Sequence, residues 1–446
     1  MGYISRRNRR PPEYASMSGH ISFMNEEAVK QFLGQCKLPP SVNEVAIPQS
    51  NIVTVPALKR NPIDLIIAVD GGFGEVTVRK EFPSSILTFY KFGALMFKVS
   101  DLENLQSRPF IDPSDIAKLK QIKRFPFVLP TRNISVKGHS LTDSVRLTFY
   151  EFFTDSQEGE KPFIDSLRWL IFEQYRSDTQ SPEWNLASCP TCRGKNIKIT
   201  PEMDNSFPCP YCSNTLYLTD IFRLHEVIDN ELGAEGIISY TMSLLEQLLL
   251  VHLVKTIWDL KPDLLSNVLF IKDGPLAFFG QTANLHKPMR SLVSFLAKKS
   301  DSNNMINLVG IEKSGAFVDH ANEIRELLKP GQAFILDNDY INKYIIPGQD
   351  YGKSTYYGNK VFFRTEDDKL YVLTLPTFQK KDKPTVEDFP GFYTILNNVS
   401  KLKCDMYDDA LIPVAIVNKL VSLSQHPSIT LIEHFAKEHL SSPSNN

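Results

Sequence analysis

Two aspartates occur in matching local settings about two hundred residues apart. Asp70 follows the apolar run 65–69, Asp273 follows the apolar run 268–272, and each is followed at once by a glycine. Short apolar runs rich in branched residues and closed by glycine predict buried strands, so each carboxylate is expected at a strand's carboxyl end. Neighbouring strand-end carboxylates can share Mg²⁺ or Mn²⁺, and paired-metal sites hydrolyse phosphodiesters. The alternative is that each Asp-Gly pair only builds a turn.

A glutamate inside an apolar helical pattern is a third candidate ligand. The segment 240–255 is apolar around most of its circumference, which predicts a buried helix, and Glu246 lies within it. A buried carboxylate is costly unless it is paired or bound to a cation. A metal ligand beside Asp70 and Asp273 would explain Glu246. A position on a narrow, partly solvated polar stripe with Gln247 would explain it equally, because sequence alone does not fix helix faces.

Four cysteines form the pattern C-x2-C-x16-C-x2-C. Each C-x2-C pair lets two thiolates bind one side of a tetrahedral ion, and this spacing is typical of structural zinc ribbons. Four thiolates close the coordination shell, so we expect a structural Zn²⁺. The module could contact nucleic acid or a protein, or it could only staple an insertion with too little core to fold alone. The expected ligands are Cys189, Cys192, Cys209 and Cys212.

Length and composition set broad limits. The chain has 446 residues, a hydrophobic fraction of 42%, and a formal net charge of -2 from 49 basic and 51 acidic side chains. The length allows two or three domains. The charge excludes a globally basic nucleic-acid binder but not a local basic groove. The remaining cysteines, Cys36 and Cys404, are isolated, which favours a reducing, cytoplasmic setting over a disulfide scaffold.

The N-terminal segment is basic and then rich in proline. Residues 1–19 include Arg6, Arg7, Arg9 and Arg10 but no apolar core, so they do not resemble a secretory signal. We expect a flexible tail or a phosphate-contacting arm. We also expect no membrane association, because no apolar run approaches the length of a membrane span.

The remaining pattern predicts an α/β fold with a mixed sheet, because a strand meander is followed by alternating helices and strands. We expect an N-terminal tail with an irregular or helical segment (1–60), two parts of one core (61–184 and 219–446) and a small cysteine module inserted between them (185–218). Expected strands are 64–69, 75–80, 86–99, 268–272 and 306–311, with a hairpin of 360–364 and 370–375. Expected helices are 25–35, 142–153, 163–175, 236–258, 289–297, 410–424 and 428–440.

In their order and strand contexts, three motifs resemble those of the NurA family of nucleases. They are 68–72 (AVDGG), 269–276 (LFIKDGPL) and 309–314 (VGIEKS). The resemblance runs from about Ile63 to the C-terminus, with the cysteine module as an insertion. It implies an RNase H-like core, metal-dependent cleavage of DNA, a ring-like homodimer and a HerA-type hexameric ATPase as partner. It further implies that Asp70, Asp273 and Glu246 bind Mn²⁺ or Mg²⁺ and that Lys313 steadies the scissile phosphate.

The chain departs from the family pattern in two places. Gly72 stands where the first motif commonly has serine. The family also carries a histidine in a C-terminal helix, after a Tyr-x-x-x-Leu segment that Tyr407–Leu411 resembles here, and this chain has none in that register. Asn418 could substitute as a ligand. The nearby histidines do not match the register; they are His426, His434 and His439.

Two functions therefore compete. The first is a metal-dependent DNA nuclease that acts with a motor in repair or antiviral defence, and retention of both aspartates favours it. The second is a non-catalytic DNA-binding or motor-adaptor protein that keeps the nuclease fold, and the missing histidine favours it. A zinc-ribbon scaffold without nucleic acid is a third class. A nearly neutral nuclease gains little non-specific DNA affinity from its net charge, so a dimer enclosing the strand would supply the grip.

Overall fold

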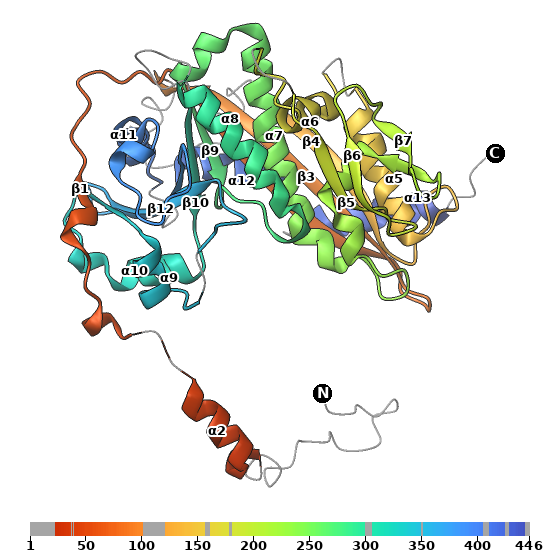
Figure 1. The fold of residues 1–446 in the computed structure, drawn as a ribbon, viewed down its shortest axis with the longest axis horizontal. Coiled ribbons are helices and arrows are strands. Elements are labelled where there is room, and N and C mark those ends of the chain that lie inside the picture. The colour runs from red at the N-terminus through yellow and green to blue at the C-terminus, as the bar shows by residue number, and fades with distance from the viewer. Residues whose placement is uncertain are drawn as a thin grey trace.

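A mixed sheet runs through the centre of the protein, whose structure is a computed structural model (Figure 1). Nine strands form this sheet within the described residues, which are 23–36, 38, 40–100, 121–156, 161–177, 181–298, 306–348, 351–404, 410–423 and 428–441. The arginines of the basic N-terminal segment, Tyr407 and His426 lie outside the described residues.

The strand order is β1-β11-β12-β13-β10-β9-β2-β3-β4. The central strands β10, β9 and β2 are parallel to one another, and all other neighbours are antiparallel. Five neighbouring strands, β4-β3-β2-β9-β10, form the core of this sheet. Numbered one to five along the chain from β2, they lie in the order 3-2-1-4-5, which is the order of an RNase H-like sheet. The predicted fold class is therefore confirmed. The bounds are β1 Ile52–Thr54, β2 Leu65–Arg79, β3 Ser85–Lys98, β4 Gln121–Arg132, β9 Val268–Asp273, β10 Asn307–Glu312, β11 Gln332–Ile335, β12 Gly358–Arg364 and β13 Leu370–Pro376.

The first core strand is longer than expected. Two separate strands, 64–69 and 75–80, were predicted, but β2 continues through both and through the glycines between them. The prediction that Asp70 ends a strand is therefore wrong, because Asp70 lies inside β2. Its parallel pairing with β9 does stop at Val69, which pairs with Lys272. Asp70 thus lies where β2 loses its parallel neighbour, although the strand itself continues beside β3.

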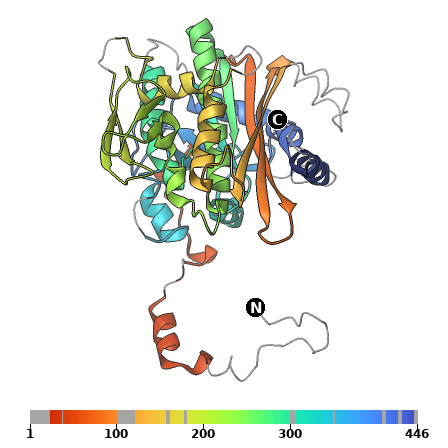
Figure 2. The ribbon, with the colours of Figure 1, turned by 90° about the vertical axis from the view of Figure 1, so that its right-hand side faces the viewer.

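Helices cover both faces of the sheet (Figures 1 and 2). One hydrophobic cluster joins α5, α6, α7 and α8 to one face, and a second joins α11 and α12 to the other. Side chains of β2 and β9 alternate between these clusters, as strand geometry requires. The bounds are α5 Leu141–Thr154, α6 Phe163–Ile171, α7 Ile238–Leu260, α8 His286–Lys298, α11 Phe392–Lys401 and α12 Ile412–Val421.

The helix α7 is the central buried helix. With its preceding turn it spans Glu235–Leu260, which is long and apolar enough to cross a membrane by length and composition alone. The prediction that no apolar run approaches that length is therefore wrong. Most of this segment is buried inside the protein, where it packs against β2, β3 and α6, which is the environment of a core helix.

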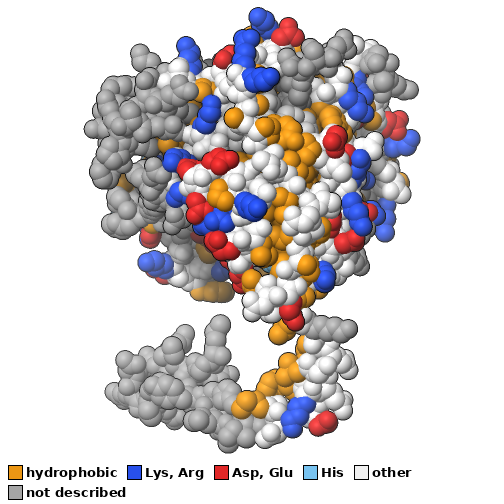
Figure 3. Space-filling view, turned by 90° about the vertical axis from the view of Figure 1, so that its left-hand side faces the viewer, with side chains coloured by type: hydrophobic (Ala, Val, Ile, Leu, Met, Phe, Trp, Pro, Cys, Tyr) orange, Lys and Arg blue, Asp and Glu red, His pale blue; other side chains and the backbone are white. Residues whose placement is uncertain are grey.

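Two of the next four helices, α9 and α10, were not predicted from the sequence, whereas α13 and α2 match the helices predicted over 428–440 and 25–35. The helices α9 (Ala316–Glu323) and α10 (Asn338–Tyr344) pack with β11, β12 and β13 around a third hydrophobic cluster. The helix α13 (Ser428–Ser441) packs along β2. The helix α2 (Glu27–Gln35) lies apart from the body, and Figure 3 shows its hydrophobic side chains open to solvent.

The cysteine-containing segment forms two short hairpins that pack on the core. They are β5 (Trp184–Ser188) with β6 (Lys195–Ile199), and β7 (Ser206–Pro208) with β8 (Thr215–Tyr217). Leu186, Ile197 and Leu216 belong to the same hydrophobic cluster as α5, α6 and α7. The segment therefore shares the main core instead of building one of its own.

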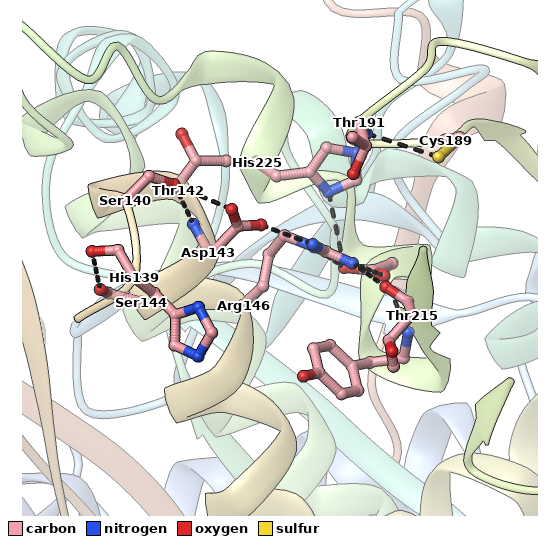
Figure 4. A network of polar contacts seen from close by, with 12 residues as sticks. His139, Ser140, Thr142, Asp143, Ser144, Arg146, Cys189, Thr191, Thr215 and His225 are labelled. Carbon is pink, nitrogen blue, oxygen red and sulfur yellow. Dashed lines mark hydrogen bonds and ion pairs between the residues drawn. The ribbon is translucent and has the colours of Figure 1, made fainter. Parts of the chain in front are cut away.

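A buried ion pair also fixes this segment to α5 (Figure 4). The guanidinium of Arg146 donates to both carboxylate oxygens of Asp220, at 2.8 Å each, and further to Asp143 and to the carbonyl of Thr215. The Asp220 carboxylate in turn accepts from the backbone N–H of Tyr217. Because both partners of the pair are almost fully buried, each compensates the charge of the other.

We predict that Arg146→Ala lowers the free energy of unfolding by roughly 3–5 kcal/mol, because it leaves the Asp220 carboxylate buried and unpaired. Urea denaturation followed by circular dichroism measures the change. Lys161→Ala, which removes an exposed partner of Asp259, is the control and should leave the midpoint nearly unchanged. Equal midpoints for the Arg146 and Lys161 variants would contradict this role of the pair.

Candidate active site

Two of the predicted carboxylates lie side by side at the carboxyl edge of the parallel strands. Asp273 is the last residue of β9, and the pairing of Val69 with Lys272 puts Asp70 in the matching position on β2. Both side chains are on the α12 face, because Ala68 and Ile271, two residues earlier on each strand, belong to the α12 cluster. The structure therefore brings Asp70 and Asp273 together from segments far apart in the sequence.

The carboxylate of Asp70 is buried and only partly satisfied. Its Oδ1 accepts from the backbone N–H of Gly71 at 2.7 Å, whereas its Oδ2 is buried without a hydrogen-bond partner. Burial, together with the charges of Asp273 and Glu246, raises the pKa of Asp70 to about 8, against the lowering effect of Asn418 and Lys313. A buried oxygen without a partner, close to other acidic groups, fits a bound cation.

Asp273 has a lysine partner. The Nζ of Lys313, the residue after β10, lies 2.7 Å from Asp273 Oδ2, and both side chains remain partly exposed. The preceding Glu312 projects to the opposite face, where it pairs with the buried Lys360. Lys313 is thus a partly exposed cation next to the carboxylate pair.

Glu246 approaches the same edge from the other face of the sheet. It projects from α7, is 7% exposed, and its Oε2 lies 2.6 Å from Nζ of Lys272. Burial raises its pKa, and the charge of Lys272 opposes that shift. The interpretation of Glu246 as part of a solvated stripe is therefore wrong, because the side chain is buried and its cation is a lysine.

Lys272 is a site residue that the sequence analysis missed. It is 2% exposed, and its Nζ also donates to the carbonyl of Asp273 at 2.5 Å. It thereby links Glu246 on α7 to the end of β9. The available signal was the lysine itself, which interrupts an otherwise apolar strand directly before Asp273 and needs an anionic partner once buried.

The carboxylates are close enough to influence one another but do not form one tight cage. Among the described residues, the group of three or more ligand-type side chains whose ligand atoms all lie within 4.8 Å of one another is the cysteine cluster. Asp70 and Asp273 together can hold a divalent cation, and the partnerless Oδ2 of Asp70 is suited to it. Glu246 forms an ion pair with Lys272, so its role as a metal ligand stays a prediction. The roles of Asp70 and Asp273 as metal ligands and of Lys313 as a phosphate contact stay predictions as well.

The four cysteines do converge. The Sγ atoms of Cys189 and Cys212 are 3.9 Å apart, and those of Cys192 and Cys209 are 3.8 Å apart. In both C-x2-C turns, backbone N–H groups point at the first sulfur, and the residue after the second cysteine has a positive φ. Two matched turns around four clustered sulfurs can hold one tetrahedral metal ion.

The C-terminal candidates differ in position. Asn418 lies on the exposed side of α12 and is the one that influences Asp70. His439 lies on α13 and its Nδ1 is bonded to the carbonyl of Phe435 on the same helix. His434 also lies on α13, beside Glu433. Of the C-terminal candidates in the described chain, Asn418 is therefore the one for which a contact with Asp70 is seen.

No family model matches the chain, and no curated protein matches it. Among solved structures it is similar to the NurA nuclease from Sulfolobus solfataricus, with 10% identity, a TM-score of 0.35, and coverage of 97% of this chain and 100% of that chain. It is also similar to a second NurA, with 11% identity, a TM-score of 0.31, and coverage of 96% and 99%. A NurA with manganese matches with 14% identity, a TM-score of 0.29, and coverage of 94% of each chain.

These matches name the same family as the sequence motifs do. Identities of 10% to 14% and TM-scores below 0.5 leave the function to be decided by the residues of the site itself.

The raised pKa of Asp70 predicts a pH dependence of stability. The carboxyl has an ordinary pKa of 3.8, as in the unfolded chain, and a pKa of about 8 in the fold. Its contribution to stability is therefore complete below pH 4 and is lost as the pH rises through 8. Asp70→Asn removes this loss. Without divalent ions, we expect the free energy of unfolding of the variant to rise relative to that of the unmodified protein by at least about 1 kcal/mol as the pH increases from 5 to 9. One pKa unit is worth about 1.4 kcal/mol.

Urea denaturation of both proteins at several pH values measures this gain. Added Mn²⁺ should stabilise the unmodified protein at pH 9 and not the variant, because a cation favours the ionised carboxylate. Parallel pH profiles for the two proteins without metal would contradict the raised pKa.

Proposed function

We propose that the protein is a divalent-metal-dependent nuclease that hydrolyses phosphodiester bonds in DNA. The observation that carries the proposal is the pair of carboxylates, Asp70 and Asp273, on adjacent parallel strands at one edge of an RNase H-like sheet. Asp70 is buried with a partnerless oxygen, and an accessible cation, Lys313, adjoins Asp273. Oxygen ligands from carboxylates suit Mg²⁺ and Mn²⁺.

The side chains divide the work in this proposal. Asp70 and Asp273 would hold the cation, and a divalent cation bound there would supply activation of water and stabilisation of charge on the phosphate. Lys313 steadies the scissile phosphate from the open side. Lys272 and Glu246 neutralise each other behind the sheet edge and hold the end of β9, so that Asp273 keeps its position relative to Asp70.

A second candidate is a DNA-binding or motor-adaptor protein that has kept the fold without the chemistry. The observation that favours it is Asn418 beside Asp70, because an amide does not transfer protons as a histidine does. The nuclease is favoured by the presence of Asp70, Asp273 and Lys313. A protein that binds DNA only elsewhere on its surface would need none of these three side chains.

The wider setting follows from the sequence resemblance to NurA. We propose a cytoplasmic homodimer that encloses DNA and acts with a HerA-type hexameric ATPase in DNA repair or antiviral defence. Its formal net charge of -2 supports the enclosure, because such a chain gains little from non-specific phosphate attraction. A monomeric mass by light scattering, with cleavage unaffected by a HerA-type ATPase, would contradict this setting.

We predict that the purified protein cleaves linear DNA with Mn²⁺ and that Asp70→Asn lowers the rate by at least about 100-fold, since even groups that only support metal ligands are worth 10- to 100-fold. Glu75→Gln removes the same charge from an exposed position further along β2 and serves as the control with an unchanged rate. Full cleavage by the Asp70 variant, at an unchanged thermal midpoint, would remove Asp70 from the mechanism.

We also propose that the four-cysteine cluster binds one structural Zn²⁺. Metal analysis should find one zinc per chain, and Cys192→Ser should lose it. Because the hairpins share the main hydrophobic core, the loss should lower the midpoint of the whole unfolding transition. Cys36→Ser, at an exposed and isolated thiol, is the control. A zinc-free protein with all four thiols reactive would contradict this proposal.

A further inference from the structure

Arg290, on α8, is a half-buried arginine for which the described residues provide no acidic partner. Its guanidinium donates through Nη2 to the backbone carbonyl of Tyr356, and its Nε is buried without a hydrogen-bond partner. Burial lowers its pKa, and no carboxylate opposes that shift. Six other arginines of the described chain are paired with carboxylates; they are Arg132, Arg146, Arg176, Arg223, Arg325 and Arg364.

The neighbours of Arg290 are also basic. Burial lowers the pKa of His286, and the charges of Arg290, Lys287 and Lys380 lower it further. The acceptor at His286 is the carbonyl of Ala283, a neutral group. In the first turn of α8, Lys287 is exposed. Within the described chain, four basic side chains therefore lie near one another, and no carboxylate affects the pKa of His286 or Arg290. The four are His286, Lys287, Arg290 and Lys380.

This basic cluster adjoins the loop that leaves the candidate active site. Tyr356, which accepts from Arg290, pairs with Ala277, and Ala277 is four residues after Asp273. Four residues span at most about 14 Å of extended chain. The hydrogen bond from the N–H of Phe278 to the carbonyl of Thr355 holds the same two loops together. The cluster therefore lies within a few nucleotides' length of the carboxylate pair.

A desolvated guanidinium without a counter-ion is costly, and a bound anion removes that cost. The planar donors of arginine match the oxygens of a phosphate group, and a nearby lysine adds a point charge. We propose that Arg290 and Lys287 bind a backbone phosphate of the DNA strand whose scissile bond lies at Asp70 and Asp273. This inference rests on the proposed nuclease function. It assigns a second place, beyond the cleavage site, where the protein contacts the DNA strand.

The experiment measures binding apart from cleavage. A fluorescent oligonucleotide is titrated with protein carrying Asp70→Asn, and anisotropy is recorded between 50 and 300 mM salt. The Asp70 background prevents cleavage without a chelator, which could also strip the cysteine cluster. Arg290→Gln and Lys287→Gln should each weaken binding of every sequence and flatten the slope of log affinity against log salt by about 1, the value for one phosphate contact.

Arg223→Gln, which changes the same charge at a guanidinium paired with Glu226, is the matched control and should keep the slope. Lys287→Gln guards against a folding defect, because Lys287 is exposed and its variant should keep the thermal midpoint. Oligonucleotide binding with slopes unchanged in both the Arg290 and Lys287 variants would overturn the phosphate subsite and leave the nuclease proposal standing.

Two other outcomes also decide the matter. If the Asp70→Asn protein binds no oligonucleotide at any salt concentration, both the nuclease proposal and the subsite fail. Inorganic phosphate, tested alone by thermal shift, separates a free anion from a nucleic-acid backbone. A stabilisation by phosphate that Arg290→Gln removes, with oligonucleotide binding unchanged, would assign the cluster to a free anion and overturn the proposal.

Discussion

The close approach of two helices to the glycines of β2 is the constraint on which the rest of the site depends. A Cβ on Gly71 would collide with Met242 of α7, and a Cβ on Gly72 would lie 3.0 Å from the carbonyl of Val421 at the end of α12. Because successive side chains alternate, these two glycines admit a helix on each face of one strand. Asp70, directly before them, is consequently buried between the two layers, and this burial is the largest cause of its raised pKa.

The charges at the sheet edge follow from that burial. Asp273 is paired with Lys313 and Glu246 with Lys272, whereas Asp70 has no direct lysine partner and keeps one oxygen unsatisfied. Three carboxylates and two lysines leave a local excess of one negative charge if all are ionised. A proton on Asp70, whose pKa is about 8, removes this excess below that pH. The site can therefore be stable without a metal ion, and a cation that replaces this proton would favour the ionised carboxylate.

The cysteine segment shows how a region with few apolar residues can be fixed firmly. Its hairpins contribute Leu186, Ile197 and Leu216 to the main core, and its end carries Asp220 to the guanidinium of Arg146. The four sulfurs of the same segment also lie together, so its two C-x2-C turns are adjacent. The segment thus packs against α5 and α6, which lie on the α7 face of the sheet, so it supports the layer that positions Glu246.

The elements with strong local signals were predictable, and those decided by tertiary packing were not. Alternating apolar residues predicted the β12–β13 hairpin, and the paired C-x2-C motifs predicted the sulfur cluster. Asp-Gly was interpreted as the end of a strand because glycine usually ends one. In β2, however, the glycines allow α7 and α12 to pack closely on the strand, and the contacting residues are more than a hundred positions away in the sequence. Lys272 was counted within an apolar run, and only the position of Glu246 on α7 shows which anion it pairs with. A charge in an apolar strand therefore identifies a site only once the helix covering that strand is known.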